Sequence, residues 1–237
     1  MWKKENSTMN KEKFWELIDT ARAAAGNIIR DSNCFVEGPQ FCDYLKRELA
    51  LLNLPDLIKW KQIYDTYHYM SYGDSLRLWV AAHFIDGYCS PDGFGYFRNW
   101  LIANGKAVYL KALYNPDDLA ELEINVYARL KGLSSVAEEA FAAKNGLCIH
   151  GDSFDFYKVM ELCAPMTEEE KKSIASEVIY APSHKLCSDA IKGDYCEVKK
   201  WFPKLRKYKR SWKTICAANE SGLCDSSVLY IETLVDL

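Results

Sequence analysis

The sequence of 237 residues has no long apolar run. Its longest uninterrupted run of hydrophobic residues is five, from Leu78 to Ala82, whereas a helix that spans a membrane needs about 20. The first residues are charged, and no apolar stretch of the kind found in a secretory signal follows them. We therefore expect no membrane partner and a cytoplasmic location.

The chain also lacks an excess of positive charge. Its 30 basic residues are balanced by 33 acidic ones, and the net charge is −3. This balance excludes a protein that is basic throughout, the commonest charge signature of nucleic-acid binding. Hydrophobic residues make up 49% of the chain and aromatic residues 14%, which is enough to bury a core in one or two domains.

No two of the nine cysteines form a Cys-x-x-Cys pair, and their number is odd. Both features argue against a disulfide framework, so we expect reduced thiols, most of them small apolar residues of the core. Two groups of Cys, His and Asp residues have spacings that match no known zinc site, and we expect no metal ion and no other cofactor. These residues are Cys148, His150, Asp152, His184, Cys187 and Cys196.

Sequence motifs of enzymes are missing as well. The chain contains no Gly-x-Ser-x-Gly elbow, no phosphate-binding glycine-rich loop and no dinucleotide fingerprint. Cys89 and His83 form the one thiol–imidazole combination that is close in sequence, and a nucleophilic thiol needs such a base. His83 falls on the apolar face of its helix, however, which favours a histidine of the core over a catalytic base.

What the sequence does contain is helical periodicity. Apolar residues recur at spacings of three and four in segments that begin at capping residues, such as Asn10, Ser90 and Thr167. Outside the C-terminal tail, no segment shows the alternation of apolar and polar residues that is typical of a strand. We predict an all-α protein, a compact multi-helix domain with a smaller helical C-terminal extension, and leave open whether the tail 228–235 is helix or strand. The predicted core contains Phe14, Ile18, Trp79, Val80, Phe84, Phe97 and Leu101.

Five short sequence segments within the first 146 residues are distinctive in combination and in their order along the chain. They are residues 14–18 (FWELI), 78–87 (LWVAAHFIDG), 89–94 (CSPDGF), 97–102 (FRNWLI) and 115–117 (NPD). Together they resemble an uncharacterised bacterial family, catalogued as domain of unknown function 4240. The resemblance implies a bacterial, intracellular protein and implies no chemistry.

The resemblance divides the chain in two. It covers about residues 9–146, and residues 147–237 form the helical C-terminal extension, in which nothing is recognised. Within the resembling part, an acidic residue often stands in the family where this chain has Pro91. Proline at a helix start keeps the fold, but it removes a carboxylate that a polar site could use.

Four chemically useful side chains lie close together at the junction between two predicted helices: Asp86, Cys89, Asp92 and Arg98. They could form a small pocket for an anionic or amide-bearing ligand. They could equally hold a helix hairpin together through a cap and an internal ion pair, with Arg98 lying along the packing seam and its head bonded to a carboxylate or a carbonyl. We favour the structural role.

A basic segment, residues 199–213, contains eight basic residues, no acidic one and several aromatic rings. Such a segment could bind nucleic acid or another anion, because cations neutralise phosphates and rings stack on bases. We favour a structural interpretation, either a solvated helix face or an intramolecular match to the acidic stretch 152–170. The residues of the candidate patch are Lys204, Arg206, Lys207, Lys209, Arg210 and Lys213.

Taken together, these features indicate a non-enzymatic intracellular binding or regulatory module, and we expect another protein rather than a nucleic acid as its partner. Two alternatives stay open. One is an enzyme or small-ligand binder that uses the Asp86–Arg98 junction, and the other is a nucleic-acid-binding or toxin-neutralising protein.

Overall fold

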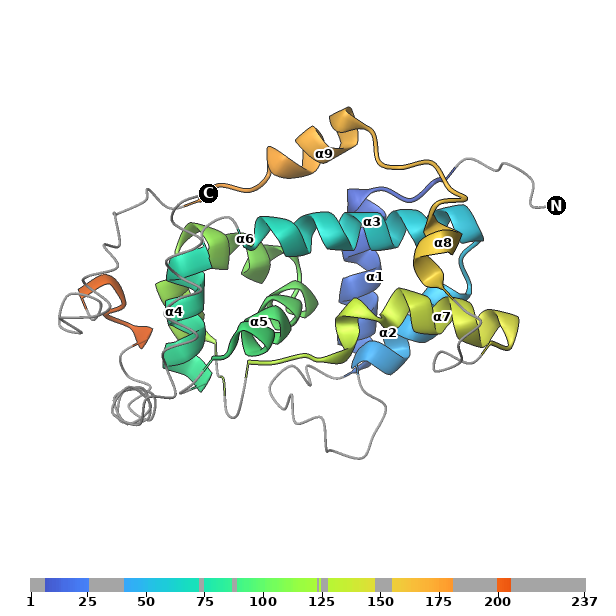
Figure 1. Ribbon diagram of the computed structural model, residues 1–237. Coiled ribbons are helices and arrows are strands. Elements are labelled where there is room, and N and C mark those ends of the chain that lie inside the picture. The colour runs from blue at the N-terminus through green and yellow to red at the C-terminus, as the bar shows by residue number, and fades with distance from the viewer. Residues whose placement is uncertain are drawn as a thin grey trace.

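The computed structural model describes residues 7–25, 41–72, 75–86, 89–122, 124, 128–147, 155–180 and 200–205 (Figure 1). This part of the chain contains α-helices, two 3-10 helices and no strand, which confirms the prediction of an all-α fold. No helix in it combines the length and the apolar character that crossing a membrane requires. The α-helices are α1 (Lys11–Ala24), α2 (Phe41–Ala50), α3 (Leu54–Met70), α4 (Ser75–Asp86), α5 (Pro91–Ala103), α6 (Lys106–Tyr114), α7 (Val136–Asn145), α8 (Phe156–Met160) and α9 (Glu168–Ala175), and the 3-10 helices are η2 (Pro116–Glu121) and η3 (Gly132–Ser134).

Helix α3 is the longest element and lies at the centre of the arrangement (Figure 1). It contacts α1, α5, α7 and α9, while α2 packs against α1 and α7 on one side and η2 packs against α4 and α6 on the other. A cluster of aromatic rings fills the space between α1, α3 and α6. Its members are Phe14, Trp15, Trp60, Tyr67 and Tyr109, all of them buried and with ring centroids 4.8–5.6 Å apart.

Most of the predicted core is buried. Phe14, Ile18, Val80, Phe84, Phe97 and Leu101 are all buried. Trp79 is the exception, because it is only partly buried and packs against the core from its edge. Its ring stands edge-on to the ring of His83, with the two centroids 4.0 Å apart.

The helix starts follow the capping chemistry of the sequence. Asn10 caps α1, Ser90 caps α5, and Thr167 forms a capping box with Glu170 at the start of α9. The residues after Asn115 form the 3-10 helix η2, which ends at Glu121 because Leu122 leaves in an extended conformation. The tail 228–235 lies outside the described residues.

Residues 155–180, which we call the strap, follow the domain in sequence and pack back against it. The strap contains α8 and α9, and Figure 1 shows α9 lying along the outer side of α3. Its apolar side chains Phe156, Met166 and Ile174 are buried in the same core as the preceding helices. A second C-terminal piece, residues 200–205, is anchored by the buried side chains of Phe202 and Leu205, with the Phe202 ring 5.4 Å from that of Phe84.

Candidate functional site

Asp86, one of the four residues predicted at the α4–α5 junction, is a buried carboxylate. Its side chain is 0% exposed and accepts hydrogen bonds from the backbone N of Ala128 and from Nε of Arg129, both at 2.7 Å. Burial raises the pKa of this carboxyl, against the opposing effect of these two hydrogen bonds. Asp86 therefore ties the start of segment 128–130 to the end of α4.

Cys89 and His83 are in contact, but not as a thiol with its base. The backbone N of Cys89 donates a hydrogen bond of 3.2 Å to Nδ1 of His83, so Nδ1 must be unprotonated. Burial, and after it the charge of Arg129, lowers the pKa of His83 to about 3. Burial also raises the pKa of the Cys89 thiol well above its usual range. At neutral pH both groups are uncharged.

Arg98 packs along the seam between α3 and α5. Its Nη1 donates a hydrogen bond of 2.9 Å to the backbone O of His68, and its guanidinium lies over the rings of Tyr72 and Phe94 at 5.0 and 5.1 Å. Asp92 is exposed in the first turn of α5. The structure thus places the four predicted residues in separate local roles, and the ion pair of this junction joins Asp86 to Arg129 rather than to Arg98.

Residues that the sequence analysis did not single out complete this buried polar layer. The hydroxyl of Tyr64 donates to Oδ1 of Asn99 at 2.6 Å, and Nδ2 of Asn99 donates to the backbone O of Leu130 at 3.0 Å. Asn99 and Asp86 therefore hold the same segment from two sides. Asn99 is inside the phrase 97–102, but no pattern in the sequence links it to a residue 31 positions away.

The basic segment is described only at its beginning. Lys204 Nζ forms ion pairs with Asp118 and Glu121, and the backbone N atoms of Lys204 and Leu205 donate to the carboxylate of Asp117. The acidic partner of this lysine is therefore η2 and not the stretch 152–170.

The other candidates of the basic patch and of the metal site lie outside the described residues. They are Arg206, Lys207, Lys209, Arg210 and Lys213 for the patch, and Cys148, His150, Asp152, His184, Cys187 and Cys196 for the metal site. Within the described ranges no group of three or more His, Cys, Asp or Glu side chains could hold a metal ion.

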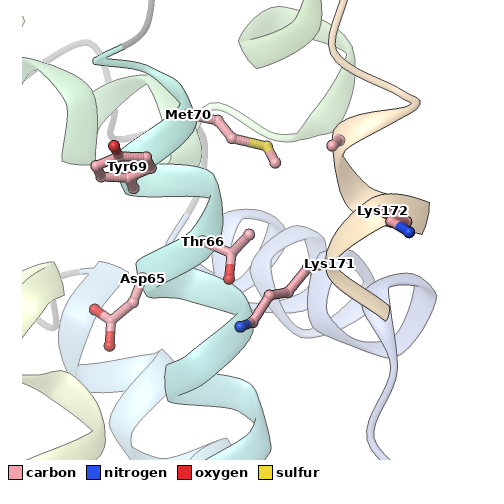
Figure 2. Close-up of a pocket in the computed structure, with 7 residues that line it drawn as sticks. Asp65, Thr66, Tyr69, Met70, Lys171 and Lys172 are labelled. Carbon is pink, nitrogen blue, oxygen red and sulfur yellow. The ribbon is translucent and has the colours of Figure 1, made fainter. Parts of the chain in front are cut away.

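An open depression of about 430 Å³ lies elsewhere, between α3 and α9 (Figure 2). Its apolar side chains include Tyr69, which is 78% exposed, and Met70, whose side chain extends toward α9. Lys171 reaches across from α9 toward α3 (Figure 2) and pairs with Glu168 at 2.8 Å, whereas Asp65 on α3 pairs with Lys61. The lining residues are Asp65, Thr66, Tyr69, Met70, Lys171, Lys172 and Ala175.

A comparison with known families gives one match. The family model described as "Protein of unknown function (DUF4240)" matches residues 9–143. Neither the curated proteins nor the solved structures contain a match to this chain. The match covers more than half of the sequence and ends before the strap begins.

Proposed function

Since the chain belongs to the DUF4240 family, whose description assigns no activity, we propose from its own residues that it is a non-enzymatic module that binds another protein in the bacterial cytoplasm. The observation that carries the proposal is the state of the α4–α5 junction. Asp86 and Cys89 are buried, Arg98 is partly buried, and all three contact other residues of the domain, so they support its packing, while Asp92 is exposed in the first turn of α5.

The junction lacks the properties that catalysis by a thiol requires. A nucleophilic cysteine needs a lowered pKa and a base in reach, whereas burial raises the pKa of Cys89 and lowers that of His83 to about 3. Nδ1 of His83 is occupied by the backbone N of Cys89. Both carboxylate oxygens of Asp86 accept hydrogen bonds from segment 128–130.

The depression between α3 and α9 supports the choice of a protein as partner. It is open and bordered by Tyr69, an exposed aromatic side chain of the type that is enriched at the centre of protein interfaces. We propose that an apolar side chain of the partner inserts beside Tyr69 and Met70. The cytoplasmic location is supported by three free thiols in the described residues, Cys42, Cys89 and Cys163, because a reducing compartment keeps thiols unpaired.

Alkylation of the native protein by N-ethylmaleimide at pH 7 tests the non-enzymatic part. Cys163 is partly exposed and serves as the internal reference, whereas Cys89 is fully buried. We expect peptide mapping to show Cys163 modified before Cys89, and Cys89 modified only as fast as the protein unfolds. Faster reaction of Cys89 than of Cys163 would reveal an activated thiol and overturn the proposal.

A photo-crosslinking amino acid at position 69 tests the binding part inside cells. Tyr157 on α8 is 74% exposed and so provides a matched control position. We expect a discrete protein adduct from position 69 that is absent from position 157 and that disappears when Thr66→Arg fills the depression. Equal crosslinking at both positions, or adducts that Thr66→Arg leaves unchanged, would contradict a specific site here.

A further inference from the structure

We propose that α1, α3 and α6 together form a binding surface for acidic helical segments, and that the strap occupies this surface until an acidic segment of a partner protein replaces it. We call this the lysine surface and define it by Lys11, Lys59, Lys106 and the hydroxyl of Tyr67. The inference rests on the proposed function, because it names the class of partner that a protein-binding module of this shape would recognise.

The first observation is the position of Glu177 at the end of the strap. Its carboxylate meets Lys11 Nζ at 2.7 Å, Lys106 Nζ at 3.0 Å and the hydroxyl of Tyr67 at 3.0 Å. These three donors come from α1, α6 and α3, respectively. Three helices that are distant in sequence therefore converge on one carboxylate of the strap.

The second observation is Lys59, whose partner also comes from the strap. Lysine is rarely buried unless it is paired, and Lys59 is only 9% exposed. Its Nζ contacts both oxygens of Glu170, at 3.1 and 2.9 Å. The domain thus presents a third lysine whose described partner lies beyond the family match.

We call the contacts of Glu170 and Glu177 with the lysine surface the two clamps. An apolar contact between them completes the motif that this surface would recognise. Ile174 lies four residues after Glu170 and three before Glu177, and it is 2% exposed. Glu170 and Ile174 share one face of α9, and Glu177 follows in the turn after the helix, where its backbone N donates to the backbone O of Ile174 at 3.1 Å. The recognised pattern is therefore an acidic residue, an apolar residue four positions later and a second acidic residue three positions after that.

The strap is attached to the lysine surface weakly enough for a competing acidic segment to displace it. Helix α9 has eight residues, too few to be stable without its docking contacts, and ion pairs in contact with solvent contribute modestly. Glu170 is 41% exposed at its side chain. The depression at the seam between α3 and α9 leaves a gap at which an incoming segment can begin to displace the strap.

The test uses the full chain with Glu170→Gln and Glu177→Gln together. The matched control carries Glu168→Gln and Glu169→Gln, which remove the same charge from exposed positions of the strap. The probe is a synthetic peptide of residues 164–180 with the natural sequence. Hydrogen exchange of residues 155–180 reports release of the strap, and titration calorimetry reports binding of the peptide.

We expect amide exchange in the strap to be at least about tenfold faster in the clamp variant than in the control, because charge-assisted hydrogen bonds are lost. The peptide should bind the clamp variant about tenfold or more tightly than it binds the natural chain, whose tethered strap competes at high effective concentration. A peptide with both glutamates changed to glutamine should not bind. Unchanged exchange in the clamp variant, or a released strap without peptide binding, would overturn the inference.

A salt series tests the same ion pairs without a substitution. If the clamp variant loses helix content, raising the salt concentration on the natural chain from about 0.05 M to about 1 M screens the same ion pairs. Strap exchange that stays constant over this range would then overturn the inference. Failure here leaves the alkylation pattern of Cys89 unaffected, so it is distinguishable from failure of the proposed function.

Discussion

Arg98 shows how a charged residue can serve the packing of two helices with no acidic partner among the described residues. Its guanidinium lies over the rings of Tyr72 and Phe94 and donates to a main-chain carbonyl at the end of α3. Its Nε is buried and has no hydrogen-bond partner among the described residues. The side chain therefore stabilises the seam through stacking and a single carbonyl contact.

We predict that Arg98→Ala destabilises the protein by about 1–3 kcal/mol, because both the stacking and the bond to the carbonyl of His68 are lost. Arg98→Lys should recover only part of this, since an ammonium lacks the planar shape that stacks on rings. Urea unfolding of the two variants and the natural chain measures the difference. An unchanged midpoint for Arg98→Ala would show that the residue does not hold the seam.

His83 is the residue for which pH has the clearest consequence. Its pKa of about 3 in the folded chain lies below the ordinary value of about 6.5. Between these two values the unfolded chain binds a proton that the folded chain does not, so the free energy of unfolding falls as the pH falls. The slope is at most about 1.4 kcal/mol per pH unit for one histidine.

We predict that His83→Asn reduces this dependence by up to one proton, because asparagine keeps an acceptor for the backbone N of Cys89 and does not titrate. His68, whose pKa burial and the charge of Arg98 lower to about 4, contributes a dependence of the same sign that the variant keeps. Urea unfolding at pH 7 and pH 5 gives both slopes. Equal slopes for the variant and the natural chain would mean that His83 is protonated in the fold.

For individual residues, the sequence predicts the kind of contact that a side chain makes better than it predicts which residue is contacted. The spacing of Phe94, Arg98 and Leu101 predicted a stem along the packing seam and a head bonded to a carboxylate or carbonyl, and the carbonyl of His68 confirms it. Arg129 could not be predicted as the partner of Asp86. The two residues are 43 positions apart, and no pattern in a single sequence encodes such a contact.

Among the elements, turn chemistry decides how closely successive helices can follow each other. Helix α5 ends at Ala103 and α6 begins at Lys106, so the chain reverses within two residues. Gly105 makes this possible with φ +90° and ψ 166°, a region open essentially to glycine alone. Gly146, after α7, has φ +63° and ψ 31°, a left-handed conformation that asparagine also tolerates.

These two glycines allow a matched prediction. Gly105→Ala and Gly105→Asn should both cost about 1–3 kcal/mol, whereas Gly146→Asn should cost less than Gly146→Ala because asparagine suits the left-handed region. Thermal unfolding of the four variants measures the costs. Recovery of stability by asparagine at position 105 would show that the turn there can relax into the ordinary left-handed region.

Helix boundaries marked by capping residues were predictable, and those without such signals were not. Asn10, Ser90 and Thr167 each lie where a side chain satisfies free N–H groups, and each begins a helix in the structure. Helix α6 was not predicted, because glycine precedes it and offers no side-chain cap. The residues after Asn115 form a 3-10 helix rather than an α-helix, a distinction that apolar spacing does not encode.

For the molecule as a whole, the contacts of the C-terminal pieces are the feature that sequence alone did not predict. The strap returns to α1, α3 and α6, and residues 200–205 return to η2 and α4. Asp117 fixes the second piece by accepting hydrogen bonds from the backbone N atoms of Lys204 and Leu205. Both pieces attach through acidic or basic side chains and a few buried apolar ones.

We predict that Asp117→Ala releases residues 200–205, because two backbone N–H groups lose their acceptor. Hydrogen exchange at the amides of Lys204 and Leu205 should become at least about tenfold faster. Asp118→Ala is the matched control, since Asp118 pairs only with the lysine side chains at this point. Equal exchange in the two variants would show that Phe202 and Leu205 hold the piece without Asp117.

The order in which the ribosome makes these parts gives the strap a further consequence. Residue 143, the last of the family match, is synthesised before Glu177, and the 34 residues between them take roughly 2–7 s at 5–20 residues per second. Throughout that interval Lys11, Lys59 and Lys106 have already been translated, while the carboxylate of Glu177 does not yet exist. Each new chain therefore passes through a period of seconds in which an acidic partner meets the lysine surface with no intramolecular competitor, so a complex could assemble on the nascent chain faster than on the finished one.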